Sequence, residues 1–205
     1  MRIRRASPCT ATLIPRGLEV RPCDLDSCNG ADLTNRFRSQ IKREEAKLAR
    51  DRRTTHLPRG WLLAGVHCEF DPTAELFQFH YHCIAADHMI AVLDELRNQP
   101  LYRHLKGDRV RDRVRISRKP LNNLPAPLGY PWQLFWPSRA RGDGTDDEVG
   151  FNQLHRMKRR IPDPYHTQQL LWLDRQRIED MTLMMGLRVG PNGFVKTYTN
   201  DGGLS

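Results

Sequence analysis

The sequence lacks any long uncharged apolar stretch. No apolar run in its 205 residues approaches the roughly 20 residues that a membrane-spanning helix needs, so we expect no transmembrane segment. The basic start Met1–Arg5 is not followed by the apolar core of a secretory signal, and we expect no such signal. Cysteines number only five, an odd and scattered set, which favours a reducing cytoplasm over a disulfide framework.

Acidic residues are also scarce relative to basic ones. Asp and Glu total 24 against 33 Lys and Arg, which gives a formal net charge of +9. This balance points to a polyanionic partner, with nucleic acid as the first candidate and an anionic membrane surface as the second.

The stretch Leu76–Ile84 carries the most informative pattern. Its sequence, Leu-Phe-Gln-Phe-His-Tyr-His-Cys-Ile, is short and aromatic and is typical of a β-strand. Alternate side chains of a strand share a face, so the aromatic residues form an apolar face and His80 and His82 project from the other. The two imidazoles then lie about 6–7 Å apart at Cα, which suits two ligands of one metal ion. Alternatively, both histidines are polar positions on a solvated sheet face.

A second strand is predicted at Trp61–Phe70, joined to the first by a four-residue turn, so the two should form an antiparallel hairpin. One register places His67 opposite Gln78 and diagonal to His80. Sliding it by one pair brings His67 directly opposite His80 and puts Glu69 opposite the glutamine. A third metal ligand can come from His67 or Glu69, and the geometry favours His67.

Residues 109–117 alternate between arginine and mostly apolar residues, as in a strand with one basic face. Neighbouring arginines repel one another unless an anion lies across them. One interpretation is therefore contact with a phosphate backbone, on a face that the histidines can share, and the other is a charged edge strand that discourages aggregation. The predicted nucleic-acid-binding residues are Arg109, Arg111, Arg113, Arg115, Arg118 and Lys119.

Three helices are predicted from apolar periodicity. The first covers residues 31–53, capped by Asp32 or Thr34, and its basic residues either form a solvated face or contact phosphate. The second covers residues 86–98. The third begins at Asp163-Pro164, carries a methionine-rich stripe and ends at Gly186.

Four segments and an α+β fold are expected. They are an irregular lead-in with a basic helix (1–58), a core (59–137), a linker loop (138–148) and a C-terminal helical segment (149–205). An antiparallel sheet would carry helices on one face and leave the other open for a ligand. Near the N-terminus, Cys9, Cys23 and Cys28 either form a zinc site or remain separate thiols, and their spacing matches no usual zinc pattern.

The order of hairpin, histidine pair, helix, arginine strand and isolated tyrosine resembles the HUH endonuclease superfamily. That group includes rolling-circle replication initiators, relaxases and single-tyrosine transposases. The resemblance is carried by Phe79–Ile84 and the strand before it. It also includes Val114–Tyr130, which is similar to the approach to the nucleophilic tyrosine in plasmid and phage replication proteins. Together these stretches cover roughly residues 60–136.

The resemblance implies an HUH-like or RRM-like sheet with a ferredoxin-like core, and a nickase of the replication-initiator (Rep) type. His80 and His82 would bind Mn²⁺ or Mg²⁺ together with His67 or Glu69. The metal would polarise a scissile phosphate at a replication origin, while Tyr130 attacks the phosphorus, retains the 5′ end as a phosphotyrosine and leaves a free 3′-OH. The implied partners are single-stranded DNA and replication proteins of the host, in the cytoplasm.

The sequence also departs from the family pattern. Family members place a lysine three or four residues after the tyrosine, whereas Tyr130-Pro131-Trp132-Gln133-Leu134 carries only Gln133 as a polar residue. A Tyr-x-x-x-Lys pattern occurs instead at Tyr102–Lys106. Two functions of other classes remain: a non-catalytic domain that binds nucleic acid through the arginine strand, and a module that docks a partner through the methionine-rich helix.

Overall fold

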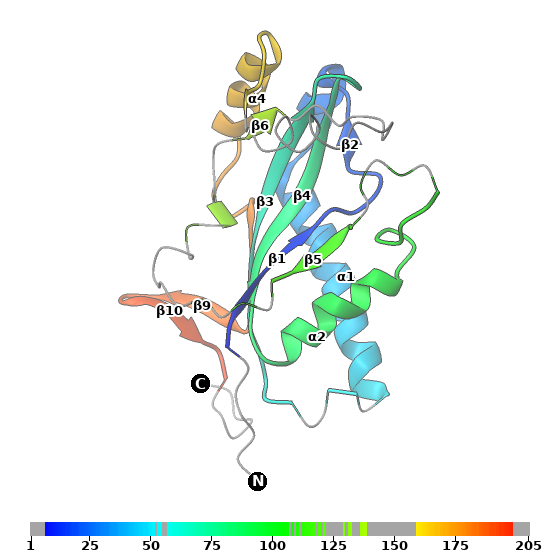
Figure 1. Ribbon diagram of the computed structural model, residues 1–205. Helices are drawn as coiled ribbons and strands as arrows, with labels where there is room; N and C mark the ends of the chain where they lie inside the picture. Colours follow the sequence, from blue (N-terminus) through cyan, green and yellow to red (C-terminus); the bar gives the residue numbers. More distant parts are fainter. Residues whose placement is uncertain are drawn as a thin grey trace.

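The computed structural model describes residues 7–51, 53–54, 57–106, 108, 110, 112–117, 119, 121, 129, 131–132, 136–138 and 159–198. Within these residues the chain forms a mixed α+β fold with a mostly antiparallel sheet and few helices (Figure 1). The predicted fold class is confirmed at this level.

Two long strands form the centre of the sheet. β3 (Leu62–Asp71) and β4 (Leu76–Ala85) pair antiparallel along their whole lengths, within one residue of the predicted bounds. Their register is the second of the two predicted ones, because His67 lies directly opposite His80. The hairpin therefore follows the period-two pattern of its sequence.

The N-terminal segment adds strands to this hairpin, so the predicted irregular lead-in before the basic helix is wrong for the described residues from 7 onward. β1 (Cys9–Leu13) lies between β4 and β5 (Val114–Ile116), and β2 (Glu19–Val20) also pairs with β4. The long β4 exposes backbone N–H and C=O groups that need partners, and β1 supplies them. Its alternating burial fits that role, although five residues give too short a pattern to predict a strand.

The described strands of this sheet follow the order β5-β1-β4-β3-β6-β7, with β2 on β4 and β8 on β3. β6 (Pro137–Ser138) pairs parallel with β3, and β7 (Arg159–Arg160) pairs with β6. The 3₁₀ turn η1 (Pro22–Ser27) leads into the first helix. Strands from the N-terminal and C-terminal segments thus share one sheet with the predicted core, and Ser138 of the predicted linker joins it in β6.

Helix α1 (Gly30–Arg50) begins one residue before the predicted start and is capped differently. The side chain of Asn29 accepts a hydrogen bond from the Ala31 N–H at 2.8 Å, so the predicted caps Asp32 and Thr34 are wrong. The Thr34 hydroxyl instead lies within hydrogen-bond distance of the backbone carbonyl oxygens of Gly30 (2.8 Å) and Asp180 (2.5 Å), which share its one hydrogen. This contact ties the first turn of α1 to the C-terminal part of the chain.

Helix α1 covers the apolar face of the central hairpin. Phe37 stacks on Tyr81 with ring centroids 4.1 Å apart, and the Tyr81 hydroxyl donates to the Leu33 carbonyl at 2.8 Å. Helix α2 (His88–Glu95), extended by the 3₁₀ turn η2 (Leu96–Asn98), packs beside α1 (Figure 1). Among the helices that the structure describes, none is long and apolar enough to cross a membrane.

The C-terminal segment is only partly helical. It contains α4 (Tyr165–Asp174), β8 (Thr182–Met185), β9 (Leu187–Gly190) and β10 (Gly193–Lys196). The predicted helix to Gly186 is therefore wrong: the methionine-rich end pairs as β8 with Leu62–Gly65 of β3. The free edge of β3 overrides the helical periodicity of that stretch. Gly186, with φ 68°, makes the turn between β8 and β9 rather than ending a helix.

Candidate metal centre

Three histidines converge on the face of the sheet opposite to α1. His67 Nδ1 lies 3.0 Å from His80 Nε2, and the same Nε2 lies 3.1 Å from His82 Nε2. One nitrogen from each ring falls within 4.8 Å of the others. Within the described part of the chain, this is the only group of three or more His, Cys, Asp or Glu side chains arranged to hold a metal ion.

The strand geometry produces this convergence. His80 and His82 are two residues apart on β4 and therefore share a face, and the register brings His67 from β3 directly opposite His80. All three rings are buried, with exposed fractions of 3% for His67, 2% for His80 and 8% for His82. The rigid hairpin thus holds three imidazoles in a partly closed, low-dielectric position.

A backbone carbonyl orients the central ring. His80 Nδ1 lies 3.2 Å from the carbonyl oxygen of Gln78, and a carbonyl oxygen can only accept a hydrogen bond. The proton of the neutral ring is therefore assigned to Nδ1, which leaves the lone pair of Nε2 directed at the other two histidines. Such a contact from the non-coordinating nitrogen fixes the tautomer that a metal ligand needs.

The arrangement selects His67 over Glu69 as the third member of the cluster. Glu69 lies opposite Gln78, one step further along the same face, and is only half-buried. The three imidazoles can bind a divalent transition metal and leave a coordination position open for water or substrate. The three N-terminal cysteines do not join such a cluster: Cys9 is buried, Cys23 exposed and Cys28 half-buried.

The backbone of Pro131 lies against Gly65 of β3, next to the histidines. Gly65 lies opposite His82, and a Cβ atom placed on Gly65 would come within 1.8 Å of the Pro131 carbonyl oxygen. Only glycine permits this close approach. The next residue, Trp132, donates its indole N–H to the Thr182 hydroxyl at 2.8 Å. The approach of Pro131 to Gly65 was not predicted from the sequence. A glycine inside a long strand is the signal that a backbone can approach closely there.

Tyr130, the predicted nucleophile, lies outside the described residues. The alternative tyrosine, Tyr102, is buried, and its hydroxyl donates to Gln40 Oε1 at 2.7 Å. Burial raises the pKa of Tyr102 well above its usual value, and burial also raises the pKa of Tyr81, which packs against α1. Neither of these two hydroxyls is available to attack a phosphate at the histidine cluster.

One of the predicted basic residues shares the face of the histidines. Arg115 of β5 lies opposite Thr12 of β1, and Thr12 lies opposite His82 of β4. Arg115 is thus two strand spacings, or about 10 Å, from His82. Arg115 and Lys119 are both exposed, whereas Arg109, Arg111 and Arg118 lie outside the described residues. The strand itself covers only Val114–Ile116, shorter than the predicted 109–117.

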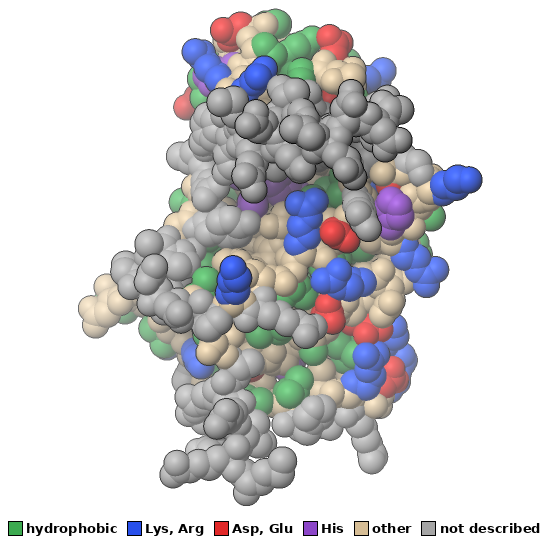
Figure 2. Space-filling model, in the orientation of Figure 1, with side chains coloured by type: hydrophobic (Ala, Val, Ile, Leu, Met, Phe, Trp, Pro, Cys, Tyr) green, Lys and Arg blue, Asp and Glu red, His purple; other side chains and the backbone are tan. Residues whose placement is uncertain are grey.

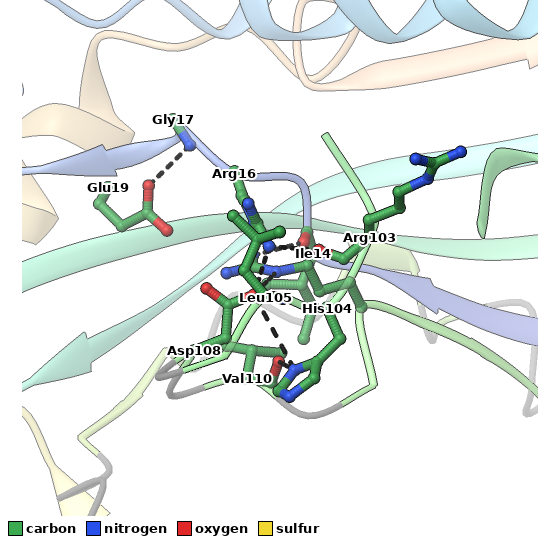
Figure 3. A network of polar contacts seen from close by, with 10 residues as sticks. Ile14, Arg16, Gly17, Glu19, Arg103, His104, Leu105, Asp108 and Val110 are labelled. Carbon is green, nitrogen blue, oxygen red and sulfur yellow. Dashed lines mark hydrogen bonds and ion pairs between the residues drawn. The ribbon is translucent and has the colours of Figure 1, made fainter. Parts of the chain in front are cut away.

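Arg113 points into the protein rather than toward a ligand, which corrects its predicted place on an open basic face. Its side chain is buried, donates to the Ile14 carbonyl at 3.1 Å and pairs with Asp108 at 3.3 Å. Arg16 binds the same carboxylate at 2.5 Å, and the Leu105 N–H donates to it at 2.9 Å (Figure 3). Alternation along the sequence did not reveal this partner, because Asp108 approaches from the preceding loop.

Replacing Asp108 by asparagine should lower the free energy of unfolding at neutral pH by about 1–3 kcal/mol, because Arg113 loses a charged partner. Desolvation alone would raise the pKa of Asp108, but hydrogen bonds from the Leu105 N–H and two arginines outweigh it and lower that pKa to about 2. The carboxylate therefore stabilises the fold fully above its ordinary pKa of 3.8, and this stabilisation is lost as the pH falls toward 2.

Urea unfolding of both proteins between about pH 7 and pH 2 measures this difference. The wild type should approach the Asp108→Asn variant as the pH falls. Asp94→Asn is the control, because Asp94 forms an exposed ion pair with Arg97 and should matter by less than about 1 kcal/mol. Equal effects of the two substitutions at neutral pH would contradict a structural role for Asp108.

No relative informs the site further. Comparison of the chain with protein family models, curated proteins and solved structures found no match. The donor set, its burial and its neighbours are therefore the basis for assigning a function.

Proposed function

We propose that the protein nicks single-stranded DNA, using a metal ion held by His67, His80 and His82 and a tyrosine nucleophile. The histidine cluster carries this proposal, because three buried imidazole nitrogens within 4.8 Å of one another form a ready ligand set. The chemistry would be that of the HUH endonucleases that the sequence resembles, with DNA replication as its setting.

The nature of the ligands favours manganese over magnesium. Mg²⁺ prefers oxygen ligands and octahedral geometry, whereas imidazole nitrogen suits softer divalent metals. A bound metal would supply a Lewis acid for a phosphoryl oxygen. The residues of the chain would contribute the fixed orientation, because the hairpin holds the three rings together and the Gln78 carbonyl orients that of His80.

Two observations support Tyr130 as the nucleophile. Pro131, the residue that follows it in the chain, rests on Gly65 directly opposite His82 in the register. The other tyrosines are engaged elsewhere. Tyr81 and Tyr102 are buried with their hydroxyls donated, Tyr165 donates to Glu75, and Tyr198 is buried beneath Arg59.

The charge on the histidine face supports a nucleic-acid partner. Arg115 extends from this face, and the whole chain has a net charge of +9. Figure 2 shows Lys and Arg side chains on this side of the molecule, with some Asp and Glu side chains among them. Such basic side chains can contact phosphates on either side of a scissile bond.

The test is formation of a covalent protein–DNA adduct. Purified protein is incubated with single-stranded DNA from its own replicon and Mn²⁺, and the products are separated on a denaturing gel. We expect an adduct that disappears in Tyr130→Phe, because the hydroxyl that would form the phosphotyrosine is removed. Tyr165→Phe is the matched control and should retain the adduct.

An adduct that persists in Tyr130→Phe would show that another residue is the nucleophile. Absence of any adduct, combined with DNA binding that survives EDTA, would instead favour the non-catalytic nucleic-acid-binding domain. In that case Arg115→Ala should weaken binding and reduce its salt dependence, because one phosphate contact is lost.

A further inference from the structure

A pocket of about 860 Å³ opens at the edge of the sheet beside β3. β3 pairs with β8 through Leu62–Gly65 and with β6 at Phe70, and Val66, which lies between these two pairings, lines the pocket. Helix α4 and the turn after it form the opposite wall with Leu170, Leu171 and Ile178. The volume is within the range of small-molecule sites and exceeds that of a single nucleobase.

The pocket lies next to the histidine cluster, although no histidine lines it. Trp136 lines it, and the ring centroid of Trp136 lies 6.3 Å from that of His67. Pro131, which rests on Gly65 beside the histidines, lines the pocket as well, and so does Trp132. A DNA strand with one phosphate at the histidines could therefore place the base of a neighbouring nucleotide in the pocket by passing the edge of β3.

The lining is suited to a flat aromatic group. Trp132 stacks on Phe194 through its indole ring and is partly exposed, so its remaining surface can contribute to the lining, and aliphatic side chains complete the walls. Leu171 is 59% exposed and Ile178 is 65% exposed, which leaves apolar surface uncovered at the mouth. Arg177 also lines the pocket, but it already forms an ion pair with Glu179 at 3.0 Å. Its positive charge is therefore partly neutralised, which makes the pocket less suited to a phosphate. The apolar lining favours a base over a phosphate.

We propose that this pocket binds an unstacked nucleobase of the single-stranded DNA that lies across the histidine cluster. The proposal rests on the DNA partner proposed above but requires neither metal nor cleavage. Stacking of bases on aromatic and apolar side chains gives affinity without strict sequence preference. Thr167 and Asp174 in the lining supply polar groups that can bond the edge of a base.

The test measures binding of a short single strand of DNA that carries one fluorescent adenine analogue, in EDTA so that no cleavage occurs. Leu171→Glu and Ile178→Glu should each raise the dissociation constant about tenfold or more, and the fluorescence change on binding should disappear. Val189→Glu is the control. Val189 is 67% exposed on β9 outside the pocket, so the variant carries the same charge change on a similarly exposed residue.

Each outcome decides the question. Weaker binding in both pocket variants but not in Val189→Glu supports the base site, even if the wild type forms no adduct with Mn²⁺. Equal affinity of all four proteins overturns the base site but leaves nicking untouched. A wild type that binds no single-stranded DNA overturns the base site and the DNA partner together. If Leu171→Glu only disrupts self-association in sedimentation, the pocket is a protein interface and the base site is wrong.

Discussion

His80→Ala should lower the affinity for Mn²⁺ by about 100-fold or more. His80 Nε2 is the atom that both other histidines approach, at 3.0 and 3.1 Å, so its removal leaves two nitrogens without their common neighbour. Altering a group that merely orients a ligand costs about 10–100-fold in affinity, and losing the ligand should exceed that range. Calorimetric titration of the purified proteins with Mn²⁺ measures the effect, and adduct formation should disappear with it.

The control uses another buried histidine of the same chain. His88 accepts a hydrogen bond from the Gly60 N–H at 2.6 Å and pairs with Glu45 at 2.8 Å, away from the cluster. His88→Ala should therefore retain the metal affinity of the wild type even if it lowers stability. Loss of the buried His80 side chain can also affect folding. His82→Ala therefore provides a second test at the most exposed of the three rings. Full metal affinity in folded His80→Ala and His82→Ala proteins would exclude the cluster as the metal site.

Phe37→Ala should lower the free energy of unfolding by about 3–5 kcal/mol. Phe37 is fully buried on α1 and stacks on Tyr81 with an interplanar angle of 6°. Its removal leaves a cavity between the helix and the strand that carries His80 and His82, and it also removes an aromatic stacking contact. Total stabilities of small proteins are about 5–15 kcal/mol, so this loss is a large share. Urea unfolding followed by circular dichroism gives the change.

The comparison is Phe194→Ala on the hairpin of β9 and β10. Phe194 is 41% exposed and stacks on Trp132 with ring centroids 5.9 Å apart. Phe194 buries less apolar surface than Phe37, so its truncation should lower the free energy of unfolding by about 1 kcal/mol. If the two substitutions destabilise the protein equally, α1 does not support the sheet as the structure indicates.

The local parts of the fold could be predicted from the sequence because their signals are local. The β3–β4 hairpin follows an alternation of side chains that fixes both faces, and a one-residue shift would move every apolar side chain to the wrong face. The choice between the two registers consistent with this alternation needed the structure. Helix α1 likewise follows its apolar stripe, and Leu33, Phe37, Ile41 and Leu48 are all buried.

The parts that could not be predicted depend on partners distant in sequence. β1 and β8 are strands of five and four residues, and each forms because a long central strand has an edge to fill. The methionine-rich stretch fits a helical and a strand pattern equally well over so few residues. Arg113 has the alternation of a surface residue, and only the folded chain brings it to Asp108 and Ile14.

The same distinction applies to the candidate site. The pair His80 and His82 and the third member His67 were accessible from strand periodicity and hairpin pairing. The partner of Gly65 could not be predicted from these patterns, because Pro131 is distant from Gly65 in the sequence. The register through Thr12 places Arg115 on the histidine face, which the alternation of residues 109–117 allowed but did not fix.

The hairpin connectivity also bears on the order in which the chain can assemble during synthesis. All three histidines lie within residues 67–82, on strands joined by a tight turn, so few residues must be ordered to bring them together. β1 is synthesised first but must wait for β4, and β8 completes the edge of β3 only after residue 182. Each doubling of the intervening length adds roughly 0.6 kcal/mol to the entropic cost of closure. The three histidines thus meet through a short connection, and their meeting does not depend on the two ends of the chain.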